Sequence, residues 1–473
     1  AYDDAKLDKN TICVTSGTYA EGDLVWANDA GYIYGTTAFN DLQTALNKAS
    51  NSQTPISIVI DGKVGTSNYG CSVTNGNAII TGNGTIQTQF FGRGAGAGSA
   101  DPHSLNSNIT IDSGVTVEVM GGAGQFSAIG TNYEIYGTVK QGGSGTLYSY
   151  LNLRDISAED GSYADKTYVT NIYEGGSLTV GGIRTRLDKS HYEINVKGGT
   201  FSLNSTAVPN DNKNFKGLHL NVTDGGVVNM NNADYSFLAG SGEDATAQFT
   251  ADNGTITAAK TTITFDAGSS FSLSNGSTAT VKGLVFNTTG NTIDASSTLT
   301  YTGAITVAEG ASFTVDFTGF EAAEDQLVAL VVDGSASTGG IEGKVDVIGL
   351  EQEGWKVVVG DSIYAYDASK VDSANLLVNA DLADDGLAIG TTVTVNGVDY
   401  LWGLNAFATF DEAMAVAKGD SVTITNGGES PCIFVADQGP TWQFVERSSN
   451  VLFAYTGKDS YLTTGTSFYT IDA

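Results

Sequence analysis

A short phrase recurs through the middle of the chain: a glycine followed by alternating polar and apolar residues, as in 114–119 and 226–230. Because successive side chains of a strand point to opposite faces, this pattern predicts strands with one buried face. The phrase begins at Gly114, Gly137, Gly176, Gly199, Gly226, Gly254, Gly268 and Gly310. Four of the seven gaps between these glycines measure 23 to 28 residues, a period typical of a solenoid.

A second strand precedes most of these glycines, as in 192–196 and 218–222, and turn dipeptides such as Asp-Gly and Gly-Gly lie between the two strands. We therefore predict that residues 55–365 form about a dozen stacked coils, spaced about 4.8 Å apart, with Asn and Thr side chains aligned in ladders. An antiparallel sandwich or barrel would also have short strands and turns. The repeated phrase favours the solenoid.

The two ends of the chain carry the same segment, displaced by 368 residues. Residues 34–49 and 402–417 share apolar positions spaced for one face of a short amphipathic helix, with strands before and after it. The matching positions are Phe39, Leu42, Ala45, Leu46 and Ala49 with Phe407, Phe410, Ala413, Met414 and Ala417. We expect these helices to cap open ends of the stack, where unpaired strand edges invite aggregation.

This duplication predicts three parts: an N-terminal end module (1–70), a β-solenoid stack (71–368), and a C-terminal end module that duplicates the first (369–473). Because the same module stands at both ends, we also predict self-association through the end modules. Contacts of this head-to-tail kind that do not close into a ring produce filaments.

The charge balance narrows the range of partners. Lys and Arg number 22 against 52 Asp and Glu, giving a net charge of −30 over 473 residues. Such a chain is repelled by nucleic-acid phosphates and by anionic membranes. The sequence has no apolar run of about 18 residues, so we expect no membrane insertion. The acidic chain opens on Ala1, as after removal of a signal peptide, and a cloned fragment would begin in the same way. We expect an extracellular or cell-surface location, where a high net charge keeps a protein soluble.

Three cysteines, Cys13, Cys71 and Cys432, are too few for a disulfide scaffold and lack zinc-site spacing. Cys71 and Cys432 follow equivalent segments of the two modules, whereas the counterpart of Cys13 falls near Leu377. A Cys13–Cys71 bridge within one end is therefore one hypothesis. Cys432 would then be free or would pair between subunits.

The segment that runs from a strand through Gly, Ala-Phe and a short helix to a second strand, at 34–62 and 402–427, resembles the start of pectin-lyase-like right-handed β-helix repeats in bacterial surface proteins. Residues 313–367 resemble the closing coils of autotransporter-like passenger domains, especially in 325–334 and 357–364. The resemblance implies an all-β, right-handed parallel β-helix on a bacterial surface. It implies no particular activity.

Enzymes of the pectin-lyase-like superfamily use Asp and Arg residues on exposed strands. Arg184 and Arg186 alternate by two, so they share one strand face and are candidates to bind a uronate carboxylate. Weak surface ion pairs are the alternative. The acidic pair Asp384–Asp385 lies far away in sequence. The histidines His103, His191 and His219 are isolated, and His219, between two leucines, is predicted to be structural.

Two further segments have a composition that occurs in ligand-binding sites. Residues 380–386 carry carboxylates suited to Ca²⁺, although a solvated acidic turn has the same composition. Residues 92–98 are rich in glycine, but no helix pattern follows them, so they predict a flexible loop and no phosphate site. We assign no catalytic, cofactor-binding or metal-ligating residue from the sequence.

The leading hypothesis is a non-catalytic structural or adhesive β-helix protein of a bacterial surface. One alternative is a lyase or hydrolase that acts on acidic glycans. It requires carboxylates beside Arg184 and Arg186. Another is a glycan binder like a phage tail spike, which would have an apolar stripe outside the coils for trimer formation.

Overall fold

The structure is a computed structural model of the 473-residue chain. It describes residues 8–471 except 67–69, 94–105, 122–123, 143–148, 155–166, 187–190, 206–207, 209–212, 241–245, 322–327, 334–343, 360–361, 384–386, 388, 410–411, 414–415, 417–420, 428–432, 437–440, 446–451, 456–459 and 465–466.

The chain divides into two compact units. The first contains Ala1–Phe320, Ala329–Glu351 and Val358–Tyr364, and the second contains Glu321–Val328, Gln352–Val357 and Ala365–Ala473. The longest segment of the second unit thus begins at Ala365.

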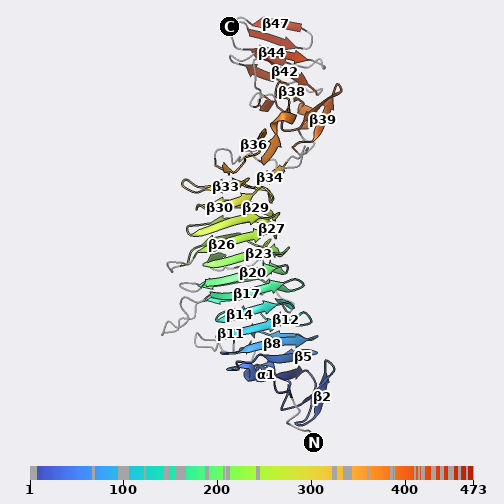
Figure 1. Ribbon diagram of the computed structural model, residues 1–473, viewed down its shortest axis with the longest axis vertical. Coiled ribbons are helices and arrows are strands. Elements are labelled where there is room, and N and C mark those ends of the chain that lie inside the picture. The colour runs from blue at the N-terminus through green and yellow to red at the C-terminus, as the bar shows by residue number, and fades with distance from the viewer. Residues whose placement is uncertain are drawn as a thin grey trace. The chain divides into compact units, whose positions relative to one another are not determined.

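The first unit is built on a 14-stranded sheet in which every strand pairs in parallel with its neighbours (Figure 1). Its strands, in spatial order, are β4 (Ala38–Phe39), β1 (Thr11–Thr15), β5 (Ile56–Asp61), β8 (Asn77–Gly82), β11 (Ser107–Ile111), β14 (Thr131–Ile135), β17 (Thr167–Tyr173), β20 (His191–Lys197), β23 (Leu218–Thr223), β26 (Ala247–Asp252), β28 (Ser269–Ser274), β30 (Asn291–Asp294), β33 (Phe313–Asp316) and β35 (Asp346–Ile348).

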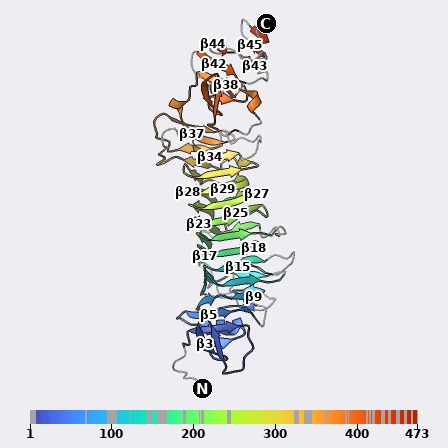
Figure 2. The same ribbon diagram turned by 90° about the vertical axis from the view of Figure 1, so that its right-hand side faces the viewer.

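A second long sheet is parallel from β6 to β34, and several of its strands lie one above another in Figure 2. These strands are β6 (Lys63–Gly65), β9 (Thr85–Thr88), β12 (Thr116–Val119), β15 (Thr138–Gln141), β18 (Ser177–Val180), β21 (Thr200–Leu203), β24 (Val227–Asn229), β27 (Thr255–Phe265), β29 (Thr278–Phe286), β31 (Thr298–Tyr301) and β34 (Val328–Asp333), with β22 (Asn214–Lys216), β25 (Tyr235–Leu238) and β32 (Ile305–Val307) attached beside them. Strands β36 (Trp355–Val359) and β37 (Ile363–Asp367) follow in sequence.

A third, five-stranded parallel sheet lies in the order β19-β16-β13-β10-β7. Its strands are β7 (Gly70–Cys71), β10 (Phe90–Phe91), β13 (Gln125–Ser127), β16 (Tyr150–Arg154) and β19 (Gly182–Arg186). Along the chain β8, β9 and β10 are followed by β11, β12 and β13, and each strand pairs with the one three labels earlier. The chain therefore visits the three sheets in turn on the passes from β5–β7 to β17–β19, and later passes contribute strands to the two long sheets.

These sheets confirm the predicted all-β class and its parallel pairing. Without β1 and β4, the first sheet has twelve strands, in agreement with the predicted dozen passes. The alternative of an antiparallel sandwich or barrel is wrong for this unit, because its long sheets pair in parallel. Apolar residues at every second position, as in β20 and β23, point into the core as the alternation predicts.

Aromatic rings stack in the core between residues 215 and 313. Phe265 is fully buried, and its ring centroid lies 5.4 Å from that of Phe237, 5.2 Å from that of Phe271 and 5.7 Å from that of Phe286. The row continues from Phe286 to Phe313 at 5.0 Å. Each ring comes from a different strand, so the stack joins successive passes of the chain.

Asparagine side chains form ladders on the outer face of the first sheet, as the sequence predicts. Asn108 Nδ2 donates to Asn77 Oδ1 at 2.7 Å. In a neighbouring column, Asn195 Nδ2 donates to Asn171 Oδ1 at 3.0 Å and Asn221 Nδ2 donates to Asn195 Oδ1 at 2.8 Å. Each amide both donates and accepts, so the ladder adds side-chain hydrogen bonds to those of the backbone.

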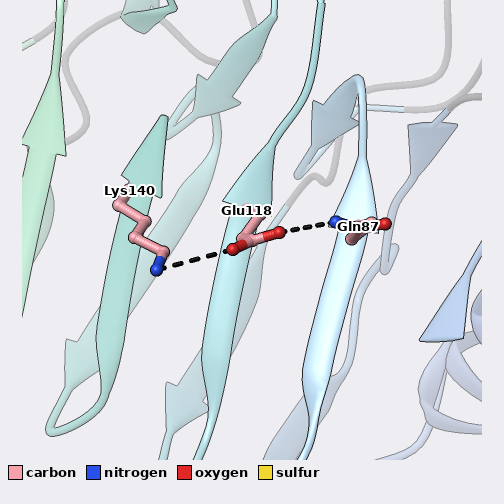
Figure 3. A network of polar contacts seen from close by, with 3 residues as sticks. All are labelled: Gln87, Glu118 and Lys140. Carbon is pink, nitrogen blue, oxygen red and sulfur yellow. Dashed lines mark hydrogen bonds and ion pairs between the residues drawn. The ribbon is translucent and has the colours of Figure 1, made fainter. Parts of the chain in front are cut away.

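A charged contact spans three strands of the second sheet (Figure 3). Glu118 Oε2 accepts a hydrogen bond from Gln87 Nε2 at 2.6 Å, and Glu118 Oε1 lies 3.4 Å from Lys140 Nζ. The hydrogen bond from Gln87, with a smaller contribution from Lys140, lowers the pKa of Glu118 below its usual 4.5. A lowered pKa in the folded state means that ionised Glu118 stabilises the fold.

Replacing Glu118 with Gln is expected to lower the free energy of unfolding at pH 7 by about 0.5–1.5 kcal/mol. The contribution is present above the unfolded-state pKa and disappears as the pH falls through the lowered folded-state pKa, because the carboxylate then becomes protonated. Urea unfolding of E118Q and the parent at pH 7 and pH 3 measures this difference, with the exposed Glu174→Gln as control. An equal loss at both pH values would contradict the assignment.

The N-terminal module consists of a hairpin, a short strand and a helix. Strands β2 (Leu24–Ala27) and β3 (Ala30–Ile33) pair antiparallel, and helix α1 (Leu42–Ala49) begins after Asp41, whose Oδ2 accepts from Thr44 N at 2.9 Å. The predicted helix is confirmed: its buried residues are Leu42, Ala45, Leu46 and Ala49. It packs against β1, β4 and β5, at the start of the first sheet.

The second unit repeats this module with the same connections. Strands β39 (Thr392–Val395) and β40 (Val398–Leu401) form the hairpin, followed by β41 (Ala406–Phe407). Thr409 and Glu412 form a reciprocal capping box at the start of the second helix. Residues 412, 413 and 416 are helical, and Ala413 is buried as predicted, whereas Phe410, Met414 and Ala417 lie outside the described residues. Strand β38 (Asn375–Val378) has the position in the second module that β1 has in the first. Leu377 of β38 pairs with Ala406, just as Cys13 of β1 pairs with Ala38. The expected equivalence of Cys13 and Leu377 is confirmed.

The second module has the same place in its sheet as the first module has. Its strands lie in the order β41-β38-β42-β44, with β42 (Ser421–Asn426) and β44 (Thr441–Val445), and this matches β4-β1-β5-β8 of the first sheet. The second module therefore stands at the edge of a separate sheet, as the first module stands at the edge of the 14-stranded sheet. Capping of the 71–368 stack by the second module stays a prediction. The unit also contains β43 (Ile433–Ala436), β45 (Leu452–Tyr455), β46 (Ser460–Thr464), β47 (Ser467–Ile471) and the 3-10 turns η3 (Ala368–Lys370) and η4 (Ala380–Leu382).

Candidate binding site on the third sheet

Arginines are concentrated on the third sheet. The chain has five, at positions 93, 154, 184, 186 and 447, and four of them lie in or beside this sheet. Arg93 lies two residues after the end of β10, Arg154 ends β16, and Arg184 and Arg186 belong to β19. In the parallel register Asn152 lies beside Arg184 and Arg154 beside Arg186. In a chain of net charge −30, this sheet therefore gathers an uncommon amount of positive charge.

Five side chains from four successive passes form one hydrogen-bonded network, which we call the third-sheet site: Arg93, Gln125, Tyr150, Asn152 and Arg184. Arg93 Nη1 donates to Gln125 Oε1 at 3.1 Å, and Asn152 Nδ2 donates to the same oxygen at 3.0 Å. Gln125 Nε2 donates to Tyr150 Oη at 2.6 Å, and Arg184 Nη1 donates to it at 3.0 Å. The network thus links the two arginines through Gln125 and Tyr150.

The donor-only arginines fix the orientation of the amides between them. Because a guanidinium cannot accept, the atom of Gln125 that faces Arg93 must be Oε1. Asn152 must then present Nδ2 to that oxygen, so its own Oδ1 points elsewhere. The hydrogen-bond chemistry therefore leaves Asn152 Oδ1 as an acceptor of the site.

The centre of the site is buried, although its residues are polar. Gln125 is 5% exposed and Asn152 2% exposed, while Arg93 and Arg184 are partly buried. Asn152 Oδ1 and Ser127 Oγ are buried and have no hydrogen-bond partner among the described residues, and Ser127 lies beside Asn152 in the register. Buried polar atoms are normally paired, because an unpaired one costs about 1–3 kcal/mol.

Each arginine also lies over an aromatic ring. The guanidinium carbon of Arg93 is 5.3 Å from the centroid of Phe90, and that of Arg184 is 5.4 Å from the centroid of Tyr150. Such contacts hold a guanidinium plane in a defined orientation while its edge remains able to bind an acceptor. Each ring contact therefore helps to fix the orientation of one guanidinium.

The structure places the sequence candidates as follows. Arg184 belongs to this site, whereas the side chain of Arg186 and the residues Asp384, Asp385, His103 and Cys432 lie outside the described residues. His191 begins β20 on the first sheet. His219 is confirmed as structural: its Nε2 lies 3.1 Å from both the carbonyl oxygen and Oγ1 of Thr246, and burial lowers its pKa.

The hypothesis of a Cys13–Cys71 bridge is wrong in this structure. Both cysteines are buried free thiols, with Cys13 on the first sheet and Cys71 on the third. Burial raises the pKa of each thiol to about 12. A thiol with so high a pKa is almost entirely protonated at neutral pH, so neither cysteine is an activated nucleophile.

The predicted calcium segment is described only in part. Asp381 N donates to Asn379 Oδ1 at 3.1 Å within η4. Within the described ranges no group of three or more His, Cys, Asp or Glu residues has the arrangement of a metal site. Calcium binding by 380–386 stays a prediction.

The comparisons with known proteins found no relative: the chain matches no protein-family model, no curated protein and no solved structure. In the part of the chain that the structure describes, no helix has the length and apolarity needed to cross a membrane.

Sequence reasoning found Arg184 but missed its partners. Arg93 was assigned to a glycine-rich loop, and Gln125, Tyr150 and Asn152 belong to no recognised motif. One signal was available, because four of the five arginines lie between residues 93 and 186. This clustering of arginines points to residues 93–186 as a region of interest, but it does not predict which strands lie side by side.

Proposed function

We propose that the chain is a non-catalytic structural or adhesive protein of a bacterial surface, with the first unit folded as a right-handed parallel β-helix. The recurring three-sheet passage of the chain supports the β-helix assignment. The likeness of the two module segments to β-helix repeats of surface proteins supports the location.

The observation that carries this proposal is that polar side chains on the outer faces of the sheets hold adjacent passes of the chain together. Asn ladders on the first sheet and the Gln87–Glu118–Lys140 contact on the second join side chains of adjacent passes to one another. Polar groups paired in this way stiffen a long stack and are not arranged around a reacting group. Side chains that bond mainly to one another are expected in a protein with a structural role.

The module hairpin is the surface we propose for self-association. Trp26 is 68% exposed and Leu24 51% exposed on the outer face of β2, and Val398 of the equivalent hairpin is 47% exposed. Large exposed apolar side chains commonly mark contact surfaces. Head-to-tail contacts through the two copies of the module would produce filaments or layers.

Negative-stain electron microscopy over a range of protein concentrations, with Ca²⁺ or with a chelator, tests this assembly. We expect regular filaments or sheets for the parent and for Val347→Ser, an exposed apolar change outside the modules. Trp26→Ser is expected to shift the protein towards single particles. Assembly is excluded if the parent remains monomeric at high concentration in both conditions.

A second candidate function, cleavage of acidic glycans, is favoured by one observation: the arginines of the third sheet. Among the described residues, Arg184 contacts Tyr150 and has no carboxylate as an ion-pair partner. A lyase or hydrolase needs such acidic groups beside the arginines for proton transfer. Release of oligosaccharides from polygalacturonate by the purified chain would establish this function in place of the first.

A further inference from the structure

We propose that Tyr136 and Tyr173 form an oxidative cross-linking site, at which hydrogen peroxide, used by a haem peroxidase, joins the two phenols into a dityrosine. The two tyrosines follow Ile135 and Ile172, which pair with each other in the parallel register of β14 and β17. The inference goes beyond the proposed function, because it concerns a covalent bond within one chain and is independent of self-association.

The rings of the two tyrosines are stacked. Their centroids lie 4.4 Å apart, and their planes differ by 5°. Because the side chains start from neighbouring positions of parallel strands, they extend in the same direction, and the ring carbons beside the two hydroxyl groups lie near each other. These carbons carry much of the unpaired electron density of a phenoxyl radical. They are therefore the atoms that couple when both phenols are oxidised.

The surroundings of the pair direct the coupling to these two rings. Tyr136 is 38% exposed, so an oxidant reaches it from solvent, while Tyr173 is partly buried. Lys197 pairs with Tyr173 in the register of β17 and β20, and its Nζ lies 5.5 Å from the centroid of the Tyr173 ring. Tyr173 thus has a tyrosine beside it in one neighbouring pass and a lysine in the other. An ammonium group does not couple with a phenoxyl radical, so the partner of Tyr173 is Tyr136.

Glu134 provides an acceptor for the phenol proton of Tyr173. A hydrogen bond from the Tyr173 hydroxyl to this carboxylate, together with burial, raises the pKa of Tyr173 well above its usual 10. The phenol is therefore protonated at neutral pH, and it loses an electron readily only if its proton leaves at the same time. Asn171 Nδ2 donates to Glu134 Oε1 at 2.8 Å and so helps to hold the carboxylate in place.

The reaction balances with peroxide as the only oxidant. Each phenol loses one electron and one proton and becomes a phenoxyl radical. A carbon–carbon bond forms between the two ring carbons next to the oxygens, and the hydrogen on each of these carbons moves to the oxygen of its own ring, which restores both phenols. Hydrogen peroxide takes up the two electrons and the two protons, its oxygen–oxygen bond breaks, and two water molecules form.

Two other tyrosine pairs of the chain serve as internal comparisons. The ring centroids of Tyr19 and Tyr34 lie 5.8 Å apart, with planes tilted by 35°, and both residues are partly buried. Those of Tyr168 and Tyr192 lie 5.6 Å apart at the same tilt, and both residues are buried. Neither pair has the close, parallel arrangement, so the first link is expected between residues 136 and 173.

Treatment of the full chain with hydrogen peroxide and a haem peroxidase tests the proposal. We expect the intact mass to fall by that of two hydrogen atoms and the blue fluorescence of dityrosine to appear. Proteolysis followed by mass spectrometry should find residues 136 and 173 in one linked pair of peptides. Because the link forms within one chain, the yield per chain should be unchanged when the protein is diluted about tenfold.

Variants separate this site from general tyrosine oxidation. Tyr136→Phe and Tyr173→Phe keep a ring in the stack but lack the phenol, so each should abolish the link. Tyr34→Phe is the matched control, because it removes a phenol from the other partly buried pair, and it should leave the yield unchanged. Glu134→Gln should slow the reaction about tenfold, since an amide is a much weaker proton acceptor than a carboxylate. Circular dichroism confirms that each variant is folded.

Four results would overturn the inference: no dityrosine in the parent, a main link between other tyrosines, a link that joins two chains and is lost on dilution, or equal losses in Tyr34→Phe and Tyr136→Phe. Each of them leaves the proposed function unaffected, because assembly is measured by electron microscopy without peroxide.

Discussion

Replacing Phe265 with Ala is expected to lower the free energy of unfolding of the first unit by about 3–5 kcal/mol. Phe265 is fully buried and stacks with Phe237, Phe271 and Phe286, which come from three other strands. Removing the ring opens a cavity between neighbouring passes of the chain, and the hydrogen-bonded sheets on either side limit its collapse. Urea unfolding followed by circular dichroism measures the loss.

The adjacent Thr264→Ala provides the matched control for the phenylalanine variant. Thr264 belongs to the same strand but points to the opposite face and is only partly buried, so the change should lie within about 0.5 kcal/mol. Similar losses in the two variants would show that the aromatic row is not a principal source of stability.

Replacing Gly226 with Ala is expected to cost about 2–3 kcal/mol, the next largest effect. A Cβ at this position would collide with the backbone carbonyl of Val196, one pass earlier in the first sheet. That carbonyl belongs to the sheet and cannot move aside as a flexible side chain would. Close approach of backbones thus explains the glycine at the start of this copy of the recurring phrase. Thermal and urea unfolding of G226A measure the cost.

The preceding glycine offers a control that separates crowding from flexibility. Gly225 has a φ of +77° and open space around its Cβ position, and Asn is the residue that best tolerates positive φ. Gly225→Asn should therefore cost about 1 kcal/mol or less. If Gly225→Asn costs as much as Gly226→Ala, the contact with Val196 is not the reason for the glycine.

The repeated fold could be predicted because its signals are local. The alternation in strands such as β20 and β23 sets the buried face, and the spacing of Leu42, Ala45, Leu46 and Ala49 sets the helix. Each depends on residues only a few positions apart. Equivalent segments also revealed the duplicated module, down to the match of Cys13 with Leu377.

The third sheet and its site could not be predicted in this way. Gln125 and Asn152 are polar residues that are buried, and a pattern of alternating polarity assigns such residues to solvent. Arg93 and Arg184 come from passes far apart in the sequence, and they are linked only through Gln125 and Tyr150 of the passes between them. Which strands share a sheet depends on the length of each pass, and those lengths vary.

The duplicated module gives each sheet that it begins a direction. In the first sheet its strand β4 occupies one edge, α1 packs against the strands there, and every further strand from β5 to β35 is added on the other side. In the sheet of the second module, β41 likewise occupies one edge, and β42 and β44 are added on the other side of β38. Such a sheet therefore has two unlike ends, one of which carries the module. A polymer built from it would be polar and would extend by joining unlike ends.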